Sequence, residues 1–365
     1  MSPSRPASGA QITAADVAAL YAGANFYSPS VGDTTRVTLI DWLTGLLGET
    51  GPLPLLKPES MPATSWCAAL CILGSGAALA DLPPAGDEFV TAVRTLERTI
   101  DRPLAAVYPL AAATVSALFP VIAAAQLGLP LLDCDGMGRA FAQINQTTMF
   151  LAGLSVSPAV LTGAAGETFT LTSPNSERAD VLSRSALDVL GGWAAFAAYP
   201  ASIGDTARGA SRGNVSRLLE VGRLLLEPMS TDLLVNRLSA VNATRRIARG
   251  RIVDLEHLTR PADLSVPTHP TSAVLDEVGG AILRLELRSE IVAAFVDGVL
   301  TAAAPDLISL FDVRSGRMAA LDSLENGDLL DVLVTPADAV WYSPEGLALV
   351  GPSVHHIPLD HPRRR

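Results

Sequence analysis

Apolar residues recurring every three to four positions predict most of the helices in this chain. Between residues 86 and 102, Phe89, Val93 and Leu96 recur at helical spacing while charged side chains lie between them, which is typical of a helix with one buried face. By the same spacing, and by residues that begin or end helices, we predict helices over 12–23, 34–47, 86–102, 111–127, 179–190, 215–226 and 232–250, and a helix or extended turn over 139–149.

Short apolar runs between turn-forming residues predict strands. In the first half these runs are 53–56, 65–73, 104–108 and 129–132, followed by strand, turn and strand within 155–172. After residue 250 they are 251–254, 282–287, 291–295, 308–312, 329–334, 339–342 and 348–350. Segments rich in Gly, Pro and small polar residues predict loops over 23–33, 197–213 and 258–274.

The order of these elements predicts two domains. Strands alternate with helices in the first half, which favours parallel pairing with right-handed crossovers, whereas short strands joined by turns dominate the end. Ser173–Arg178 is polar and turn-forming, and it provides a boundary. We therefore expect an α/β N-terminal domain over residues 12–172 and an α+β, β-rich C-terminal domain over residues 173–360.

Composition excludes several classes of protein. Hydrophobic residues make up 49% of the 365 residues and charged residues 17%, so a large core is expected and disorder is excluded as the main state. The net charge of -11 repels nucleic-acid backbones, so nucleic acid is not an expected partner. The three cysteines form no disulfide framework, which fits a reducing, cytoplasmic location.

Three uncharged stretches, residues 60–80, 103–132 and 147–166, are long enough to span a bilayer. They are rich in Ala, Gly, Ser and Thr, and the second contains four prolines, which break a single helix. No basic flanks set an orientation. We interpret them as buried strands and helices and expect no membrane association.

The most informative polar motif lies at the end of the second of these stretches. Asp133 and Asp135 follow a predicted strand, and Gly136-Met137-Gly138-Arg139 comes next. Such carboxylates suit metal ligands or a general acid and base, with Arg139 anchoring an anion or a carbonyl group. Asp-Gly is also turn chemistry, and Arg139 could simply neutralise one aspartate. The residues alone leave both interpretations open.

Other candidate groups have simpler interpretations. Cys67 and Cys71 lie four residues apart in an apolar run and are read as buried side chains. Cys134 lies between two carboxylates, which raise the pKa of a thiol, so it is also assigned to packing. The C-terminal residues His355, His356, Asp360 and His361 have the composition of a metal site, with a solvated tail as the alternative.

The chain resembles a known family at several places. The run DCDGMGRAFAQINQTT, the following GLSVSP, the later SEIVAAFVDGVLTAAAPDLISLFDVRSGRMAALDSL and the VGP at 350–352 are similar to sequences of the S-methyl thiohydantoin desulfurase family. The resemblance extends from about residue 12 to residue 360. It implies removal of sulfur from a thiohydantoin-type ring: water adds to an electrophilic ring carbon, and sulfide or methanethiol leaves.

The resemblance also implies site residues. Asp133, Asp135 and Arg139 would be catalytic, and the two aspartates are the candidate ligands if the unknown cofactor is a divalent metal. The substrate-binding candidates, which would hold a small cyclic substrate, are Gly136, Met137, Gly138, Gln146 and Glu290. Asp306, like Glu290, falls in a resembling C-terminal motif, where either residue would reach a cleft between domains or cap a turn.

Two departures from the family pattern support a second hypothesis. Family members have a glycine-rich run within the 23–33 segment, where this chain has Asn25-Phe26-Tyr27-Ser28. They also have an acidic residue and Gly-Gly near Tyr108, whereas here no acidic residue lies between Asp101 and Asp133. The alternative is a diverged member that binds or forms a subunit of a hydantoinase- or oxoprolinase-type enzyme. Assembly into a homo-oligomer stays open.

Overall fold

The computed structural model describes residues 10–28, 36–257, 270–288 and 290–362. Contacts divide them into two compact units. The first contains the described residues up to Tyr21 and those from Arg36 to Leu219, and the second contains Ala22–Ser28 and the residues from Glu220 onward. The boundary predicted at Ser173–Arg178 lies inside the first unit.

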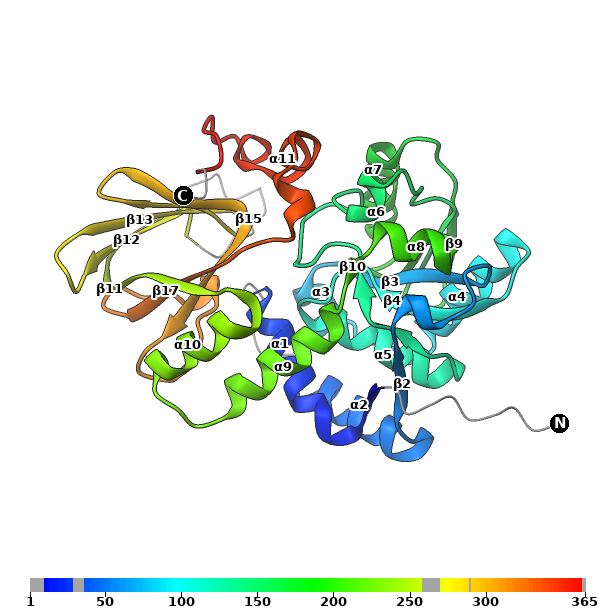
Figure 1. Ribbon diagram of the computed structural model, residues 1–365. Coiled ribbons are helices and arrows are strands. Elements are labelled where there is room, and N and C mark those ends of the chain that lie inside the picture. Colours follow the sequence, from blue (N-terminus) through cyan, green and yellow to red (C-terminus); the bar gives the residue numbers. More distant parts are fainter. Residues whose placement is uncertain (1–9, 29–35, 258–269, 289, 363–365) are drawn as a thin grey trace. The chain divides into compact units, whose positions relative to one another are not determined.

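The first unit is built on an eight-stranded sheet with the order β1-β2-β5-β4-β3-β9-β7-β8 (Figure 1). Its strands are β1 (Ala10–Ile12), β2 (Leu53–Leu56), β3 (Trp66–Gly74), β4 (Leu104–Pro109), β5 (Leu131–Leu132), β7 (Ala159–Thr162), β8 (Thr168–Leu171) and β9 (Trp193–Ser202). The neighbours β2, β5, β4 and β3 are parallel, and the remaining pairs are antiparallel. Two further short strands, β6 (Cys134–Asp135) and β10 (Ser211–Arg212), form a separate antiparallel pair.

Helices pack against this sheet, with α5 and α7 on opposite sides in Figure 1. One sheet face buries Cys67, Tyr108 and Phe196 in a cluster that also contains Ala179 of α7, and the stacked rings of Phe89 and Phe119 join α4 to α5. The helices are α1 (Val17–Phe26), α2 (Arg36–Thr50), α3 (Gly76–Asp81), α4 (Glu88–Ile100), α5 (Leu118–Leu127), α6 (Thr148–Leu151), α7 (Ser176–Leu187), α8 (Ile203–Gly209) and α9 (Asn214–Leu226).

The second unit contains a closed β-barrel. Its strands have the order β14-β13-β12-β11-β17-β15-β16, and an additional β14–β15 pairing closes the barrel. Leucine side chains such as Leu275, Leu285 and Leu330 fill its core. The elements are α10 (Thr231–Asn242), β11 (Arg245–Glu256), β12 (Ser272–Glu277), β13 (Ile282–Leu287), β14 (Ile291–Val296), β15 (Val299–Asp312), β16 (Arg317–Met318), β17 (Leu329–Thr335) and α11 (Pro344–Val350).

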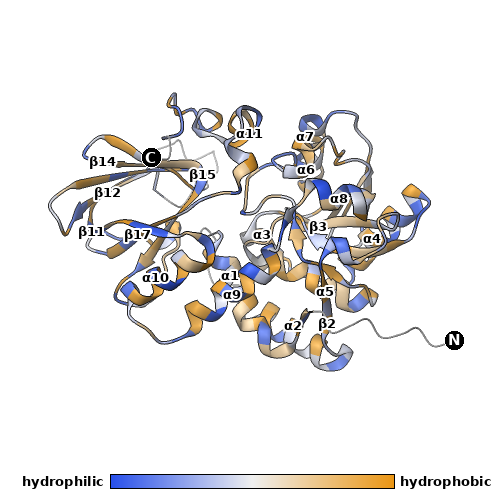
Figure 2. Ribbon diagram, in the orientation of Figure 1, coloured by the Kyte–Doolittle hydropathy of each residue, from blue (hydrophilic) through white to orange (hydrophobic). Residues whose placement is uncertain are grey.

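The predicted fold class is confirmed: an α/β unit is followed by a β-rich α+β unit. Strand β2 has the predicted bounds, and β3, β4 and α4 differ from prediction by two residues or fewer at each end. Asp297 and Gly298, a pair of residues typical of hairpin turns, join β14 to β15 and both have positive φ angles. Figure 2 shows apolar residues along the strands of both units, as the apolar runs predicted.

The largest error in the first unit concerns residues 197–213, which were predicted to form a loop. They contain the end of β9, then α8 and β10. The residues of β9 from Trp193 to Tyr199 are all buried. A strand buried on both faces shows no alternation of polar and apolar residues, and this one is also rich in alanine, so the pattern was misread.

Helix boundaries in the first unit also differ from prediction. The first helix continues to Phe26 instead of ending near Gly23. Helix α5 begins at Leu118, so the predicted start at 111 was wrong. Within 139–149, helix is limited to the beginning of α6. Residues 29–33 of the predicted 23–33 loop lie outside the described residues.

Three predictions in the second unit were wrong. The helix predicted over 232–250 ends at Asn242, and β11 begins at Arg245. Along β11 the buried residues Ala248, Gly250 and Ile252 alternate with less buried ones, which is the period of a strand. The strands predicted over 339–342 and 348–350 are a 3-10 helix and the end of α11. The loop predicted over 258–274 is only partly described: residues 258–269 lie outside the described residues, and residues 272–274 form the beginning of β12.

Candidate functional site

The Asp-Gly-Met-Gly-Arg motif lies where the sequence analysis expected it, after a buried parallel strand. Strand β5 pairs in parallel with β2 and with β4, and Asp133 follows it directly. The chain then forms β6, which pairs with β10. Binding sites of α/β proteins lie at the carboxyl ends of parallel strands, so the location suits a site.

The Asp135 carboxylate organises the loop around it. Its side chain is fully buried. Oδ1 accepts hydrogen bonds from the backbone N–H groups of Met137 (3.1 Å) and Gly138 (2.7 Å) and from the side-chain amide of Asn214 (2.5 Å). Oδ2 accepts from the backbone N–H of Ala112 at 2.7 Å. Four donors from three chain segments therefore meet at one carboxylate.

The Asp133 carboxylate caps a helix that is distant in sequence. Its Oδ1 accepts from the backbone N–H of Ser216 at 2.9 Å, and its Oδ2 accepts from the Ser216 hydroxyl at 2.6 Å. Ser216 lies in the first turn of α9, where unsatisfied N–H groups favour a negative charge. Asp133 and Asp135 thus both contact the beginning of α9, through Ser216 and Asn214 respectively.

The glycines of the motif have separate structural reasons. Gly138 has a φ of +75°, a conformation that side chains with a Cβ rarely adopt. Gly136 donates from its N–H to the Leu110 carbonyl at 2.9 Å, and its own carbonyl accepts from the Thr148 N–H at 2.7 Å. A Cβ at Gly136 would lie 2.7 Å from Cε of Met149 and 3.0 Å from the Leu110 oxygen. The loop therefore packs too tightly for a side chain at residue 136.

Replacing Gly136 by alanine is expected to lower the free energy of unfolding by about 2 kcal/mol, because the added methyl overpacks this contact. Urea unfolding followed by circular dichroism measures the change. Gly45→Ala is the matched control. Gly45 is a glycine within α2 whose added Cβ meets nothing within 4 Å, so that variant should be as stable as the original protein or up to about 1 kcal/mol more stable. Equal effects of the two substitutions would contradict the packing argument.

The remaining candidate residues lie in different surroundings. Arg139 is buried; its Nε donates to the Ala140 carbonyl at 3.3 Å, and its guanidinium lies 4.9 Å from the centre of the Phe141 ring.

Met137 belongs to the apolar core. The Gln146 Oε1 accepts from a backbone N–H at 2.9 Å. Glu290 belongs to the second unit and directly precedes β14. The functional roles of all these residues stay predictions.

The polar end of the loop is attached to later elements of the same unit. The Ile144 N–H donates to the Asp180 carboxylate of α7 at 3.0 Å, and the Tyr199 hydroxyl of β9 donates to the Ile144 carbonyl at 2.9 Å. Sequence reasoning missed Asp180 and Tyr199, and also Asn214 and Ser216. An asparagine directly before the helix predicted over 215–226 was the available signal, because asparagine is common at helix starts.

Both aspartates already bind donors of the protein. Both oxygens of each carboxylate accept hydrogen bonds from N–H or O–H donors, as described above. Across residues 10–28, 36–257, 270–288 and 290–362, no cluster of three or more His, Cys, Asp and Glu side chains is arranged to hold a metal ion. His361 lies instead beside Asp306, with its Nε2 3.4 Å from the carboxylate. Metal binding by Asp133 and Asp135 therefore stays a prediction.

The buried-cysteine interpretation is confirmed. Cys67, Cys71 and Cys134 are all buried, and the Cys67 sulfur lies 3.2 Å from the Thr206 hydroxyl. Burial raises the pKa of the Cys67 thiol from 9.0 to about 12, and it also raises the pKa of the Cys71 and Cys134 thiols. These neutral thiols are packing groups.

Their raised pKa values predict loss of stability in alkali. A thiol of the unfolded chain ionises near pH 9, whereas the same thiol in the folded protein ionises only at higher pH. Above pH 9 ionisation therefore stabilises the unfolded state, and the free energy of unfolding falls as pH rises toward the pKa of the folded thiol. We expect a loss of about 1 kcal/mol per thiol between pH 9 and pH 10. Urea unfolding at several pH values between 9 and 10 measures how steeply the free energy of unfolding falls with pH. Cys71→Ala should make this decrease shallower, and an unchanged slope would contradict the thiol assignment.

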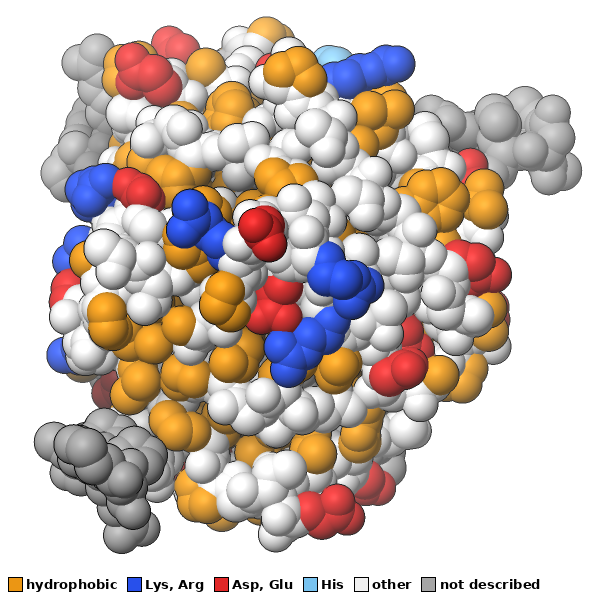
Figure 3. Space-filling model, turned by 90° about the vertical axis from the view of Figure 1, so that its right-hand side faces the viewer, with side chains coloured by type: hydrophobic (Ala, Val, Ile, Leu, Met, Phe, Trp, Pro, Cys, Tyr) orange, Lys and Arg blue, Asp and Glu red, His pale blue; other side chains and the backbone are white. Residues whose placement is uncertain are grey.

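Two further observations concern the surface of the molecule and its helices. The face shown in Figure 3 carries basic and acidic side chains close together, with no broad basic patch in that view. In the described part of the chain, no helix combines the length and the apolarity needed to cross a membrane.

Comparisons with known proteins cover nearly the whole chain. A family model described as "S-Me-THD-like, N-terminal domain" matches residues 15–173, and one described as "S-Me-THD-like, C-terminal domain" matches residues 174–362. The crystal structure of a protein from Chromobacterium violaceum matches 98% of this chain and 99% of that chain, with a TM-score of 0.80 and 20% sequence identity. At 20% sequence identity, this similarity shows that the two chains share a fold and nothing more. A comparison with curated proteins gave no match.

Proposed function

The chain belongs to the S-Me-THD-like family, and on that premise we propose that it is a hydrolytic desulfurase acting on a thiohydantoin- or hydantoin-type ring. The observation that carries this proposal is the loop from Asp133 to Thr148, which follows the parallel strand β5, is largely buried and is held by hydrogen bonds of Asp133 and Asp135. Backbone groups held in place before a ligand arrives reduce the cost of binding. A small, polar, cyclic substrate is the ligand class that such a loop suits.

The proposed reaction replaces sulfur by oxygen. Water adds to the ring carbon that bears the S-methyl group and forms a tetrahedral intermediate. The C–S bond then breaks, methanethiol leaves with one proton, and the second proton of the water stays on the ring nitrogen as the C=O bond forms. Atoms balance: S-methyl thiohydantoin and water give hydantoin and methanethiol. The protein must bind the ring, orient water and stabilise the charge that develops on the ring.

We assign different roles to the loop residues. Asp133 and Asp135 act as positioning residues, since their oxygens already accept hydrogen bonds from the protein. Arg139 carries the positive charge of the loop, and guanidinium groups stabilise developing negative charge on a carbonyl oxygen. Gln146 is also a positioning residue, since its Oε1 accepts a hydrogen bond from the Gln143 N–H within the loop.

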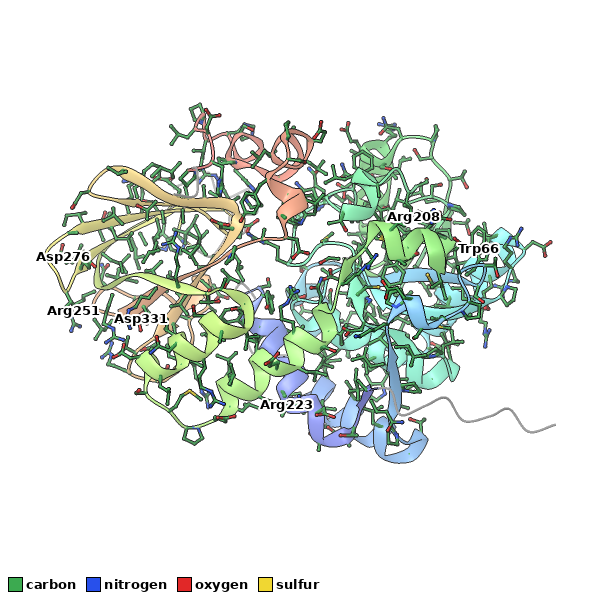
Figure 4. The ribbon with its side chains drawn as sticks, in the orientation of Figure 1. Trp66, Arg208, Arg223, Arg251, Asp276 and Asp331 are labelled. Carbon is green, nitrogen blue, oxygen red and sulfur yellow. The ribbon has the colours of Figure 1, made fainter. Side chains whose placement is uncertain are left out.

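The test is release of methanethiol from an S-methyl thiohydantoin by the purified full chain, with hydantoin identified by mass spectrometry. Arg139→Lys should reduce kcat/KM at least tenfold, because lysine keeps the positive charge but lacks the planar set of N–H donors of a guanidinium group. Arg208→Lys is the matched control, since Arg208 lies on the exposed face of α8, where it pairs with Asp205 (Figure 4). Absence of turnover on both thiohydantoins and hydantoins would overturn the proposal.

A second candidate function rests on a specific observation. The carboxylates of Asp133 and Asp135 are both engaged, and the turn after Tyr108 carries no acidic residue. A chain without an available base would serve as a binding partner or subunit of a hydantoinase- or oxoprolinase-type enzyme in the cytoplasm. This function predicts no turnover alone and a stable complex with such an enzyme in size-exclusion chromatography.

A further inference from the structure

The second unit contains a cavity that is separate from the Asp133–Thr148 loop. Its volume is about 430 Å³, within the range of pockets that hold small molecules. It lies among the end of α9, the beginning of α10, Arg249 of β11 and the turn after β15. Residues of four kinds line it: two arginines, two acidic residues, several hydroxyl side chains and several apolar side chains.

Both arginines have N–H groups directed to no protein acceptor among the described residues. Arg249 uses Nε and Nη2 to bind the Asp331 carboxylate, each at 2.7 Å, and no hydrogen bond within the described residues is made by its Nη1. Arg314 is 65% exposed, and its guanidinium has one long contact, 3.4 Å, with Asp328. The cavity therefore offers charged donors that a ligand can use.

The acidic residues of the cavity are already paired with arginines. Asp232 accepts a hydrogen bond from Arg246 at 2.6 Å and a longer one, 3.4 Å, from Nη2 of Arg249, and Glu227 forms an ion pair with Arg237. The stronger partner of each, Arg246 and Arg237, does not line the cavity, which leaves Arg314 as the least compensated charge at its rim. An anion suits this rim better than a cation.

The rest of the lining combines apolar side chains with hydroxyl groups. Phe311 and Leu234 are almost completely buried side chains that line the cavity. The hydroxyls of Thr231 and Ser315 lie among the lining residues as well and make no hydrogen bond within the described residues. A ligand with a charged end and a compact apolar body would match both parts.

We propose that this cavity binds a small organic anion, whose carboxylate or phosphate group is held by Arg249 and Arg314 and whose body contacts Phe311 and Leu234. Guanidinium groups bind both oxyanions through paired N–H donors. This site goes beyond the proposed desulfurase function, because it lies within the barrel unit and uses none of the loop residues.

Benzoate and phenyl phosphate are suitable probes, titrated into the full chain by calorimetry at low ionic strength. We expect one of them to bind, and the one that binds identifies the oxyanion. Arg314→Ala should weaken binding at least tenfold. Ser315→Trp should abolish binding by filling the cavity, without removing a charge.

Arg317→Ala is the matched control. Arg317 is an exposed arginine on β16 that does not line the cavity, so its removal changes the net charge equally and should leave the affinity within twofold. Failure of both probes to bind the unmodified chain would overturn the proposal. Equal weakening by Arg314→Ala and Arg317→Ala would also overturn it, because the interaction would then be a general charge effect.

Discussion

Replacing Asp135 by alanine is expected to lower the free energy of unfolding by about 4 kcal/mol and to release the loop around it. The carboxylate accepts four hydrogen bonds in a fully buried position. Buried donors that lose a charged acceptor cost about 1–3 kcal/mol each, less where water can enter. Hydrogen exchange at the N–H groups of Ala112, Met137 and Gly138 gives a direct measurement, since these groups should exchange much faster in the variant.

Asp205→Ala is the control for the loss of an aspartate in the same unit. The Asp205 side chain is 47% exposed, pairs with Arg208 and accepts a hydrogen bond from the hydroxyl of Ser202, the residue that caps α8, at 2.6 Å. A surface ion pair contributes about 0–1 kcal/mol and a helix-capping interaction about 1 kcal/mol, so this variant should lose at most about 2 kcal/mol, about half of the loss expected for Asp135→Ala. If Asp135→Ala unfolds at the same urea concentration as the unmodified protein, and its loop amides exchange no faster, the carboxylate does not organise the loop.

The second large effect is expected at Asp331, a buried carboxylate in the barrel that is labelled in Figure 4. It receives two hydrogen bonds from Arg249 at 2.7 Å and a longer one, 3.3 Å, from Arg246. Asp331→Ala should cost about 3 kcal/mol, because both guanidinium groups lose their buried partner. The side chains of Arg246 and Arg249 are about a third exposed. Because water screens their charges, the expected loss lies at the low end of the range for buried ion pairs.

The double substitution Asp331→Leu with Arg249→Met separates charge from packing. Replacing both partners by apolar groups leaves less uncompensated charge than removing one, so this variant should unfold at a higher urea concentration than Asp331→Ala. Asp276→Ala is the surface control, since Asp276 is exposed on β12 of the same barrel. A stability for Asp331→Ala equal to that of the Asp276 control would contradict the proposed role.

Local patterns predicted much of the fold, and they failed for identifiable reasons. The amphipathic α4, the short strand β2 and the Asp297-Gly298 turn each depend on residues that are adjacent in sequence, so they could be predicted. Strand β9 was missed because its burial depends on the strands on either side of it, β3 and β7, which are distant from it in sequence. The arginine-rich start of β11 was taken as the end of a helix because its pairing with β17 is a long-range contact.

The sequence by itself determined the family resemblance, the two fold classes and the position of the Asp-Gly-Met-Gly-Arg motif after a buried strand. It left open whether Asp135 forms a site or a turn. Only the tertiary structure decided what this carboxylate contacts: its partners Ala112 and Asn214 are separated from it by 23 and 79 residues. Periodicity and turn chemistry are short-range properties of a chain, whereas the donors that surround a buried carboxylate are assembled only when distant segments pack together.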